Sequence, residues 1–303
     1  MSKIAFVFSG QGDQYVGMGK EIFDVYPEAK NMFYKSDMIR KKTSEQCFYG
    51  TEDELKETKN TQPCLFALEA AIANVLEKHG VCDDMAAGFS LGEVVALTYG
   101  GVFDFETGFS LVCKRGELMQ AAAEKMPTSM AAVLRLSDAE VERLCGLYKH
   151  IYPVNYNSPG QVAVSGDETE MAEFYTAVKE AGGRTLPLKV KGGFHSPYMD
   201  EASALFEEEL KKVTPKKAKM PIYSDVTAQP YGDDIKNQLA MQIASPVLWK
   251  NIIVNMIGEG MDTFIEIGPG KTLCNLISKT DKSVRVYSTS SVADIEKILS
   301  EVR

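Results

Sequence analysis

Residues 84–101 have the sequence DMAAGFSLGEVVALTYGG, and this stretch determines the class of fold that we expect. The short apolar run over 84–88 predicts a strand, and the spacing from about residue 91 predicts a helix that ends at the final pair of glycines. Between them, 88–92 match the G-x-S-x-G pattern, whose glycines permit a sharp turn that lifts a serine hydroxyl out of a sheet. A chance turn with two glycines would give the same letters, but the flanking strand and helix favour a nucleophile at Ser90.

Strands and helices alternate on both sides of this stretch. Residues 3–9 predict a first strand, and 61–79 and 105–124 have helical spacing, with Thr61 as a candidate N-cap and Pro63 in the first turn. This alternation is typical of a parallel sheet covered by helices. After residue 192 it continues with helices expected over 197–213, 249–259, 270–279 and 292–302 and strands over 221–224, 262–267 and 284–288.

The pattern changes between about residues 125 and 191. Here a strand, a helix, two strands, a helix and a strand follow one another, which is the order of a ferredoxin-like unit. We therefore expect 125–191 to form an inserted ferredoxin-like subdomain, and 1–124 with 192–303 to form an α/β core with a parallel sheet. The expected elements are strands over 130–136, 151–156, 161–166 and 184–190 and helices over 138–147 and 168–183.

Composition excludes several classes of protein. Lys and Arg number 33 against 42 Asp and Glu, and this net charge of −9 disfavours nucleic acid as a partner. The apolar runs are far shorter than the roughly 20 residues of a membrane span, and the N-terminus lacks the pattern of a signal peptide. The six cysteines are scattered without a CxxC pair and the chain has 3 histidines, so we expect no metal site. We expect a cytoplasmic protein that binds neither nucleic acid nor a membrane.

A serine nucleophile needs a general base, and each histidine is a candidate. His79 ends a predicted helix, where histidine is typical of a cap, and His150 precedes a strand of the inserted unit. His195 lies in the loop that returns to the core, and loops often carry catalytic residues. We therefore predict that His195 is the base for Ser90. The chain has no histidine after residue 195, which disfavours an ordinary esterase or lipase with its Ser–Asp–His order.

Arg115 lies in the apolar stripe of the helix predicted over 105–124. A buried guanidinium needs a partner, and three interpretations are open. The side chain could form an ion pair with a distant carboxylate, it could extend to solvent, or it could hold a substrate carboxylate near Ser90. A partner on its own helix is excluded, because its neighbours there are Leu111, Val112, Leu118 and Met119.

The first turn of the chain, over 9–14, contains two glycines but has Tyr15 where a dinucleotide fingerprint would have a third. Such a turn can instead supply a backbone N–H to an oxyanion. We predict oxyanion donors at Gln11 and at Leu91, the latter at the start of the helix after the nucleophile. Gln62, near the start of its helix, either lines the same cleft or caps that helix.

Eight motifs occur along the chain in an order and spacing that resemble the malonyl-CoA:acyl carrier protein transacylases, and the resemblance covers essentially the whole chain. It implies an α/β-hydrolase-like core with an inserted ferredoxin-like subdomain. The motifs are FSGQG at 8–12, TQPCLF at 61–66, GFSLGE at 88–93, RGELMQ at 115–120, NSPGQVAVSG at 157–166, GFHS at 193–196, SPVLW at 245–249 and IGPGKTL at 267–273.

The resemblance implies a role for each site residue. Ser90 would be the acylated nucleophile and His195 its base, and Gln11 and Leu91 would supply the oxyanion N–H groups. A main-chain carbonyl, which falls on Leu248, would replace the third member of the usual triad. The same resemblance gives Arg115 the free carboxylate of a malonyl group as its ligand.

Two phenylalanines refine the resemblance. Phe194, before the base, resembles the malonyl-selecting form of its motif, whereas enzymes for branched acyl groups have a smaller residue there. Phe89 departs from the family, which usually has histidine before the nucleophile. That position is outside the pair of residues that carries the chemistry.

The implied reaction is ping-pong transfer of malonyl from coenzyme A, through a serine ester, to the phosphopantetheine thiol of acyl carrier protein. It would supply extender units for fatty-acid or polyketide synthesis, with the coenzyme A thioester as a substrate and no cofactor or metal. We expect a monomer. Because acyl carrier proteins are typically acidic, we also predict a local basic patch near the cleft, formed by Lys189, Lys191 and Lys271.

Two rival functions stay open at this point. A serine hydrolase could use the same Ser90–His195 pair on the same thioester. A non-catalytic module that binds carrier protein is a different class of protein, and the presence of both Ser90 and His195 disfavours it.

Overall fold

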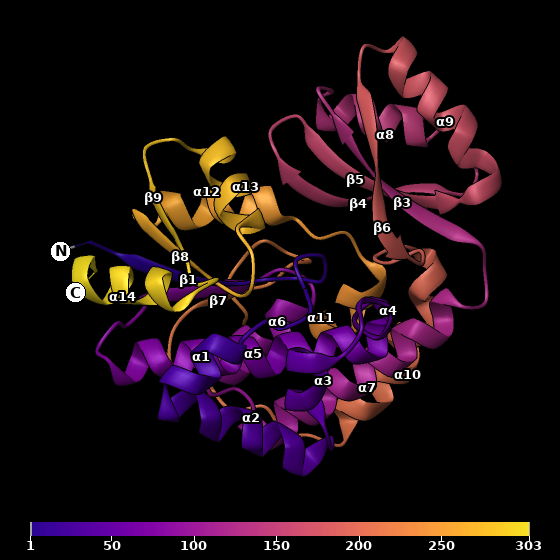
Figure 1. The fold of residues 1–303 in the computed structure, drawn as a ribbon. Helices are drawn as coiled ribbons and strands as arrows, with labels where there is room; N and C mark the ends of the chain where they lie inside the picture. The colour runs from indigo at the N-terminus through magenta and orange to yellow at the C-terminus, as the bar shows by residue number, and fades with distance from the viewer. Residues whose placement is uncertain (1, 303) are drawn as a thin grey trace.

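The chain folds around two β-sheets, one at the left of Figure 1 and the other at its upper right. The computed structural model describes residues 2–302, except for the side chains of residues 189 and 191. The larger sheet is parallel and the smaller one is antiparallel. The predicted combination of a parallel α/β core and an inserted antiparallel subdomain is confirmed.

The parallel sheet is buried on both faces. Successive side chains of its first strand point to opposite sides, so Phe6 packs into one hydrophobic cluster and Val7 into another. Such short, apolar strands are stable only between two layers of helices. In sheet order, the strands are β7 (Ile222–Tyr223), β2 (Met85–Gly88), β1 (Ile4–Phe8), β8 (Thr263–Ile267) and β9 (Arg285–Ser288).

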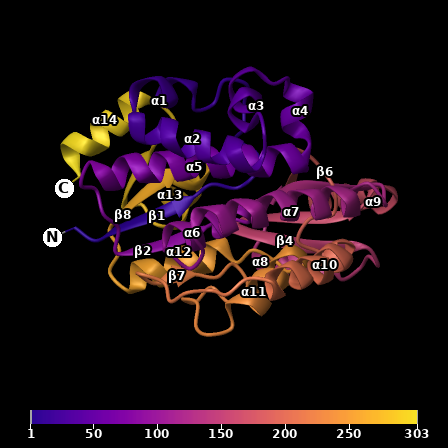
Figure 2. The same cartoon turned by 90° about the horizontal axis from the view of Figure 1, so that it is seen from below.

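Helices cover both faces of this sheet, as Figure 1 shows. The helices on the Phe6 face include those that lie together at the top of Figure 2, which are α1 (Lys20–Val25), α2 (Pro27–Ile39), α3 (Thr43–Tyr49), α4 (Glu52–Lys56), α5 (Thr58–Lys78) and α14 (Val292–Glu301). The cluster that contains Phe6 also includes residues of α6 (Leu91–Tyr99), α7 (Phe105–Ala123), α10 (Asp200–Lys211) and α11 (Ile235–Met241). The Val7 face is covered by α12 (Trp249–Gly258) and α13 (Thr272–Thr280). Two 3-10 turns lie at Pro197–Met199 and Gln242–Ala244. No helix within residues 2–302 is both long and apolar enough to cross a bilayer.

The smaller sheet is built from β3 (Thr128–Leu134), β4 (Ile151–Ser158), β5 (Gln161–Asp167) and β6 (Arg184–Lys191), with α8 (Asp138–Cys145) and α9 (Glu168–Glu180) against it. Its spatial order is β4-β5-β3-β6, which is the order of a ferredoxin-like unit. The core touches its edge, because Val247 N–H donates to Val154 O and Tyr156 N–H donates to Val247 O. The boundaries of the division into 1–124 with 192–303 and 125–191 stay a prediction.

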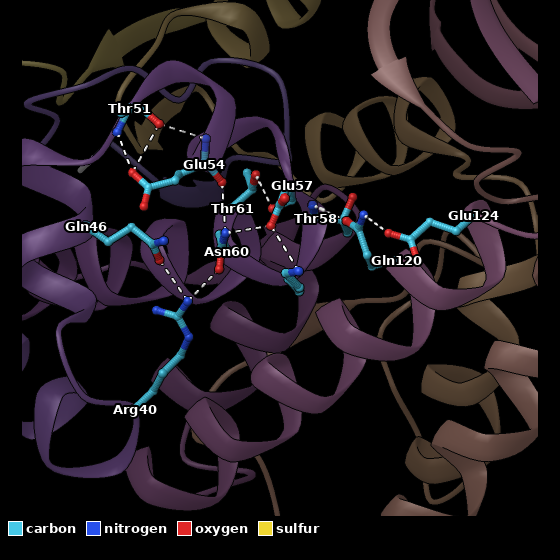
Figure 3. Close-up of polar contacts among 11 residues, drawn as sticks. Arg40, Gln46, Thr51, Glu54, Glu57, Thr58, Asn60, Thr61, Gln120 and Glu124 are labelled. Atoms are coloured by element: carbon cyan, nitrogen blue, oxygen red, sulfur yellow. Dashed lines mark hydrogen bonds and ion pairs between the residues drawn. The ribbon is translucent and has the colours of Figure 1, made fainter.

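The start of α5 differs from the prediction, and polar contacts hold it in place (Figure 3). The helix begins at Thr58 rather than near residue 61, and Gln120 of α7 accepts a hydrogen bond from the Thr58 N–H at 2.8 Å. Thr61 is therefore inside the helix, where its hydroxyl donates to Leu55 O, and it is not the N-cap. Pro63 also lies inside the helix rather than in its first turn.

Candidate active site

Ser90 occupies the turn between β2 and α6. Its backbone has φ 56° and ψ −108°, a conformation that residues other than glycine rarely adopt. A Cβ at position 88 would lie 2.0 Å from the carbonyl carbon of Gly92, and a Cβ at position 92 would lie 2.4 Å from Phe8 O. Both positions need glycine because the backbone segments approach so closely, and the sharp turn that the sequence predicts is present.

The structure brings Ser90 and His195 together from distant parts of the chain. Ser90 Oγ and His195 Nε2 are 2.8 Å apart, within hydrogen-bonding distance. The His195 N–H donates to Ile243 O, which anchors the loop, and the residue has a positive φ of 59°. Both members of the predicted pair thus lie on strained backbone that the surrounding structure holds in place.

The main-chain carbonyl that faces the imidazole belongs to Gln242, not to Leu248 as the family resemblance implied. His195 Nδ1 lies 2.9 Å from Gln242 O, whereas Leu248 lies at the start of α12 and its N–H donates to Asp225 O. The 3-10 turn after α11 directs the Gln242 carbonyl toward the ring. Because a carbonyl can only accept, Nδ1 carries the hydrogen and Nε2 presents its lone pair to Ser90.

His195 is neutral at neutral pH. Its burial lowers the pKa of the imidazole, and the positive charge of Arg115 lowers it further, to about 4. A neutral imidazole with a free lone pair at Nε2 is the form that can accept the proton of the Ser90 hydroxyl.

Arg115 is fully buried on α7, which excludes the interpretation that it extends to solvent. Nη2 donates to Gln242 Oε1 at 2.6 Å and to Ser90 Oγ at 3.3 Å, and both acceptors are neutral groups. Nε and Nη1 have no hydrogen-bond partner among the residues that the structure describes. Burial lowers the pKa of the guanidinium to about 10, while Glu93 and Asp225 favour its charged form, so it is a cation at neutral pH.

Two buried carboxyl groups behind the nucleophile were not identified from the sequence. Asp225 Oδ2 accepts from the Ser90 N–H at 2.8 Å and from Gln242 Nε2 at 3.0 Å. Glu93 Oε1 accepts from the Asp225 N–H at 3.0 Å and from the Tyr231 hydroxyl at 2.6 Å. Burial raises the pKa of Glu93 to about 7, and burial and the charge of Glu93 raise the pKa of Asp225 well above its usual range. The pair therefore retains a proton at neutral pH.

Signals for these two residues were present in the sequence. Glu93 is an acid inside the otherwise apolar helix LGEVVALTY, and Asp225 follows the strand expected over 221–224. An acid on a buried helix must find a polar partner, and side chains after parallel strands gather at the same edge of a sheet. The sequence alone could not show that the two meet.

A cavity of about 620 Å³ opens at the Ser90–His195 pair. Gln62 reaches it from the second turn of α5, where its Nε2 lies 3.3 Å from Met119 Sδ, so it lines the cleft rather than capping the helix. The assigned roles of the lining residues stay predictions. The predicted residues that line the cavity are Gln11, Gln62, Leu91, Phe194, Ser90 and His195, and Phe89 lines it as well.

The smaller sheet supplies another wall of the cavity, which the sequence did not assign. Asn155 and Asn157 on β4 line the cavity and are each 8% exposed. Neither side-chain oxygen has a hydrogen-bond partner within the described part of the chain. Two buried amides beside a cavity, each with an unpartnered oxygen, are suited to bind the polar groups of a ligand.

The other candidates lie away from the pair. His79 closes α5 at its C-terminal end, as predicted, and its ring packs against Tyr26. His150 precedes β4, where its N–H donates to Glu170. Of the predicted basic patch, the side chains of Lys189 and Lys191 lie outside the described residues, and Lys271 is exposed with its Nζ 3.9 Å from Asp294.

Comparison with known proteins gives a consistent result. The family model described as "Acyl transferase domain" matches residues 5–298. A malonyl CoA-acyl carrier protein transacylase of Bacillus subtilis (strain 168) is 36% identical over 312 residues, which cover 100% of this chain and 98% of the relative. A protein of the same name from Synechocystis is 34% identical, with 98% of this chain and 100% of the relative covered.

Solved structures agree with the sequence relatives. The crystal structure of malonyl CoA-acyl carrier protein transacylase from Clostridium perfringens superposes with a TM-score of 0.96 at 39% identity, covering 100% of this chain and 98% of that one. A malonyl-transacylase in complex with its type II polyketide synthase acyl-carrier protein superposes with a TM-score of 0.95 at 30% identity, covering 99% of both chains.

Proposed function

Because this chain belongs to the acyl transferase domain family, as a malonyl-CoA:acyl carrier protein transacylase, we propose that the pocket at Ser90 carries out both halves of malonyl transfer. One observation supports this assignment most directly. The same Ser90 Oγ lies 2.8 Å from a neutral imidazole and 3.3 Å from a buried guanidinium. The nucleophilic oxygen thus lies close to both its base and a cation that can bind the substrate carboxylate.

In the first half-reaction, His195 Nε2 takes the Ser90 proton while Oγ attacks the thioester carbonyl of malonyl-CoA. The predicted backbone donors, Gln11 N–H and Leu91 N–H, face the charge that develops on the carbonyl oxygen. The carbon–sulfur bond then breaks, and coenzyme A leaves with the proton that His195 carried. A malonyl ester of Ser90 remains. The Gln242 carbonyl holds the ring throughout, because it accepts from Nδ1–H in both protonation states.

In the second half-reaction, the phosphopantetheine thiol of acyl carrier protein takes the place of coenzyme A. His195 removes the thiol proton, the thiolate attacks the ester carbonyl, and Ser90 Oγ recovers its proton from the imidazole as it leaves. Both thiols carry the same pantetheine arm, so one cleft can serve them in turn. The unpartnered amides of Asn155 and Asn157 provide polar contacts for that arm along the cavity wall.

Arg115 selects the acyl group in this proposal. In a malonyl ester of Ser90, a single methylene separates the free carboxylate from the ester carbonyl, so the carboxylate lies near the guanidinium. It would supply acceptors for N–H groups that have no partner among the described residues. An acetyl ester offers no acceptor there and leaves the buried cation unpaired, which disfavours it.

Mass spectrometry of the intact protein tests this function. Incubation with malonyl-CoA should add one malonyl group, located on Ser90 by peptide mapping, and addition of holo acyl carrier protein should remove it and load the carrier. The Ser90→Ala variant is the matched control and should gain nothing. An adduct on Ser90→Ala would show that another residue is the nucleophile.

The same experiment distinguishes the two rival functions. Malonyl-CoA consumption without carrier protein, at rates that match transfer, would identify a hydrolase. A folded protein that binds carrier protein but gains no adduct from malonyl-CoA would identify a non-catalytic module.

A further inference from the structure

Gln242 forms hydrogen bonds with four residues of the active site, which are His195, Arg115, Ser90 and Asp225. It is fully buried at the junction of α11 and the following 3-10 turn. Its main-chain carbonyl accepts from His195, its Oε1 accepts from Arg115 at 2.6 Å, and its Nε2 donates to Ser90 O at 2.6 Å. Nε2 also donates to Asp225 Oδ2 at 3.0 Å. The main-chain carbonyl contacts the base, and the side-chain amide contacts Arg115, Ser90 and Asp225.

The orientation of the Gln242 amide is determined by its neighbours. A guanidinium has only donors, so the group that faces Arg115 must be the amide oxygen. Ser90 O is a carbonyl, and Asp225 Oδ2 already accepts from the Ser90 N–H, so the group that faces them must be the amide nitrogen. A flipped amide would oppose donor to donor on one side and acceptor to acceptor on the other. The side chain therefore connects Arg115 to the backbone of the nucleophile in a single arrangement.

This connection fixes the guanidinium where the acyl group will be. Within the described residues, Gln242 Oε1 is the side-chain acceptor closest to Arg115, and the remaining contact, to Ser90 Oγ, is longer at 3.3 Å. When Ser90 is acylated, its Oγ becomes an ester oxygen and a weaker acceptor. The amide of Gln242 is then the contact that keeps the guanidinium beside the ester.

We propose that the Gln242 side chain is a positioning residue for recognition of the acyl carboxylate: it holds Arg115 against the acylated serine and thereby sets the preference for malonyl over uncharged acyl groups. This inference rests on the proposed function, because it needs Arg115 to bind the malonyl carboxylate. It assigns one role to the main chain of Gln242 and another to its side chain. The main-chain carbonyl orients the base for any acyl substrate, and the side chain acts on acyl choice alone.

Two substitutions test the side chain while the main-chain carbonyl stays in place. Gln242→Met keeps the length of the side chain and removes its amide, and Gln242→Asn keeps an amide that is too short to reach both Arg115 and Ser90 O. The kcat/KM values for malonyl-CoA and acetyl-CoA, with carrier protein as acceptor, should show a malonyl-to-acetyl ratio lowered by about tenfold or more, the size expected for loss of a hydrogen bond to a charged group. Gln238→Ala, one turn earlier on α11, is the matched control and should keep the wild-type ratio.

A double-mutant cycle with Arg115→Ala locates the effect. In the Arg115→Ala background, Gln242→Met should lower the ratio no further, because there is no guanidinium left to position. An unchanged ratio in both Gln242 variants, or an equal loss on both substrates with a lowered melting temperature, would overturn the inference. If Arg115→Ala lowers the ratio and Gln242→Met does not, the inference fails alone. If Arg115→Ala itself keeps the wild-type ratio, the carboxylate role in the proposed function fails and the inference fails with it.

Discussion

The two sheets contribute to the cleft in different ways. The parallel core supplies the two groups in contact with Ser90 Oγ, His195 and Arg115, and each also contacts Gln242 in a buried hydrogen-bond network. The smaller sheet supplies apolar side chains and amides to the same cavity, and none of its described lining residues is ionisable. This difference suggests that the core determines the chemistry and the acyl group, while the smaller sheet determines how the thiol arm is admitted. The lining residues from the smaller sheet are Met130, Ala132, Asn155, Asn157, Gln161, Ala163, Pro187, Leu188 and Val190.

The largest effect is expected at Arg115, in the core. Arg115→Ala should lower kcat/KM for malonyl-CoA by a factor that corresponds to about 2–5 kcal/mol, the usual cost of truncating one member of a buried charge pair. The kcat/KM for acetyl-CoA should stay the same or rise. Arg115→Lys should restore only part of the loss, because an ammonium cannot reproduce the planar fork of a guanidinium. Kinetics on both substrates, together with a melting temperature, check this. Equal losses on both substrates would mean that Arg115 is structural and that the core does not choose the acyl group.

The second effect is on the base. His195 must be neutral to accept a proton, so activity falls as the pH drops through its pKa, which burial and Arg115 lower to about 4. Arg115→Ala removes the cationic cause and should move the acid limb of kcat/KM for acetyl-CoA to higher pH. Lys114→Ala, which removes a half-buried cation on the same helix that pairs with Glu117, is the control and should not move it. An acid limb at the same pH in Arg115→Ala and wild type would show that burial alone lowers the pKa.

A smaller effect is expected on the opposite wall. Asn157→Ala removes a cavity-facing amide from the smaller sheet, so it should raise KM for malonyl-CoA and carrier protein by about tenfold at most, as for loss of a hydrogen bond between neutral groups. The amount of malonyl-Ser90 formed at saturating malonyl-CoA should stay the same. Asn275→Ala, an exposed asparagine on α13, serves as the control. A fall in kcat with unchanged KM would contradict the division of roles between the sheets.

The smallest effect is expected where the two sheets meet. Phe194 is buried next to the base and lines the cavity, in the loop that follows β6. Phe194→Ser should make room for a branched acyl group and raise the methylmalonyl-to-malonyl ratio of kcat/KM by about a few-fold. This is less than the roughly tenfold or more that a methyl group is worth in a pocket shaped for it, because the space left by the ring is not shaped to the methyl group. An unchanged ratio in a folded variant would assign Phe194 to support of the loop only.

Much of the fold could be predicted because local patterns agreed with tertiary structure. The helix predicted over 138–147 forms over Asp138–Cys145, with Ser137 as its N-cap. The helices between Lys20 and Lys56 were not predicted, although α4 carries a capping box from Thr51 to Glu54. These helices are short, and α2 buries only Ala29, Phe33 and Ser36, so their apolar periodicity is weak.

Part of the candidate site could likewise be predicted from the sequence, and part could not. Ser90 and His195 could be predicted because one sits in a recognisable turn and the other had few competitors. The carbonyl partner of the base could not, because every residue has a carbonyl and sequence position does not tell which one turns toward a ring. The buried polar network was missed for a related reason. Its members come from segments that are far apart in the chain, as the pairing of Glu93 with Asp225 illustrates.

The strained backbone of Ser90 is needed for activity and lowers the stability of the fold. A non-glycine residue at φ 56° and ψ −108° costs about 1–3 kcal/mol, and the nucleophile must bear this strain to reach the base. Ser90→Gly should relieve the strain, whereas Ser90→Ala keeps the Cβ and should not. The inactive glycine variant should therefore melt at a higher temperature than the equally inactive alanine variant, and equal melting temperatures would argue that the turn is relaxed. In thermodynamic terms, this protein gives up part of its folding free energy to keep one hydroxyl group ready for reaction.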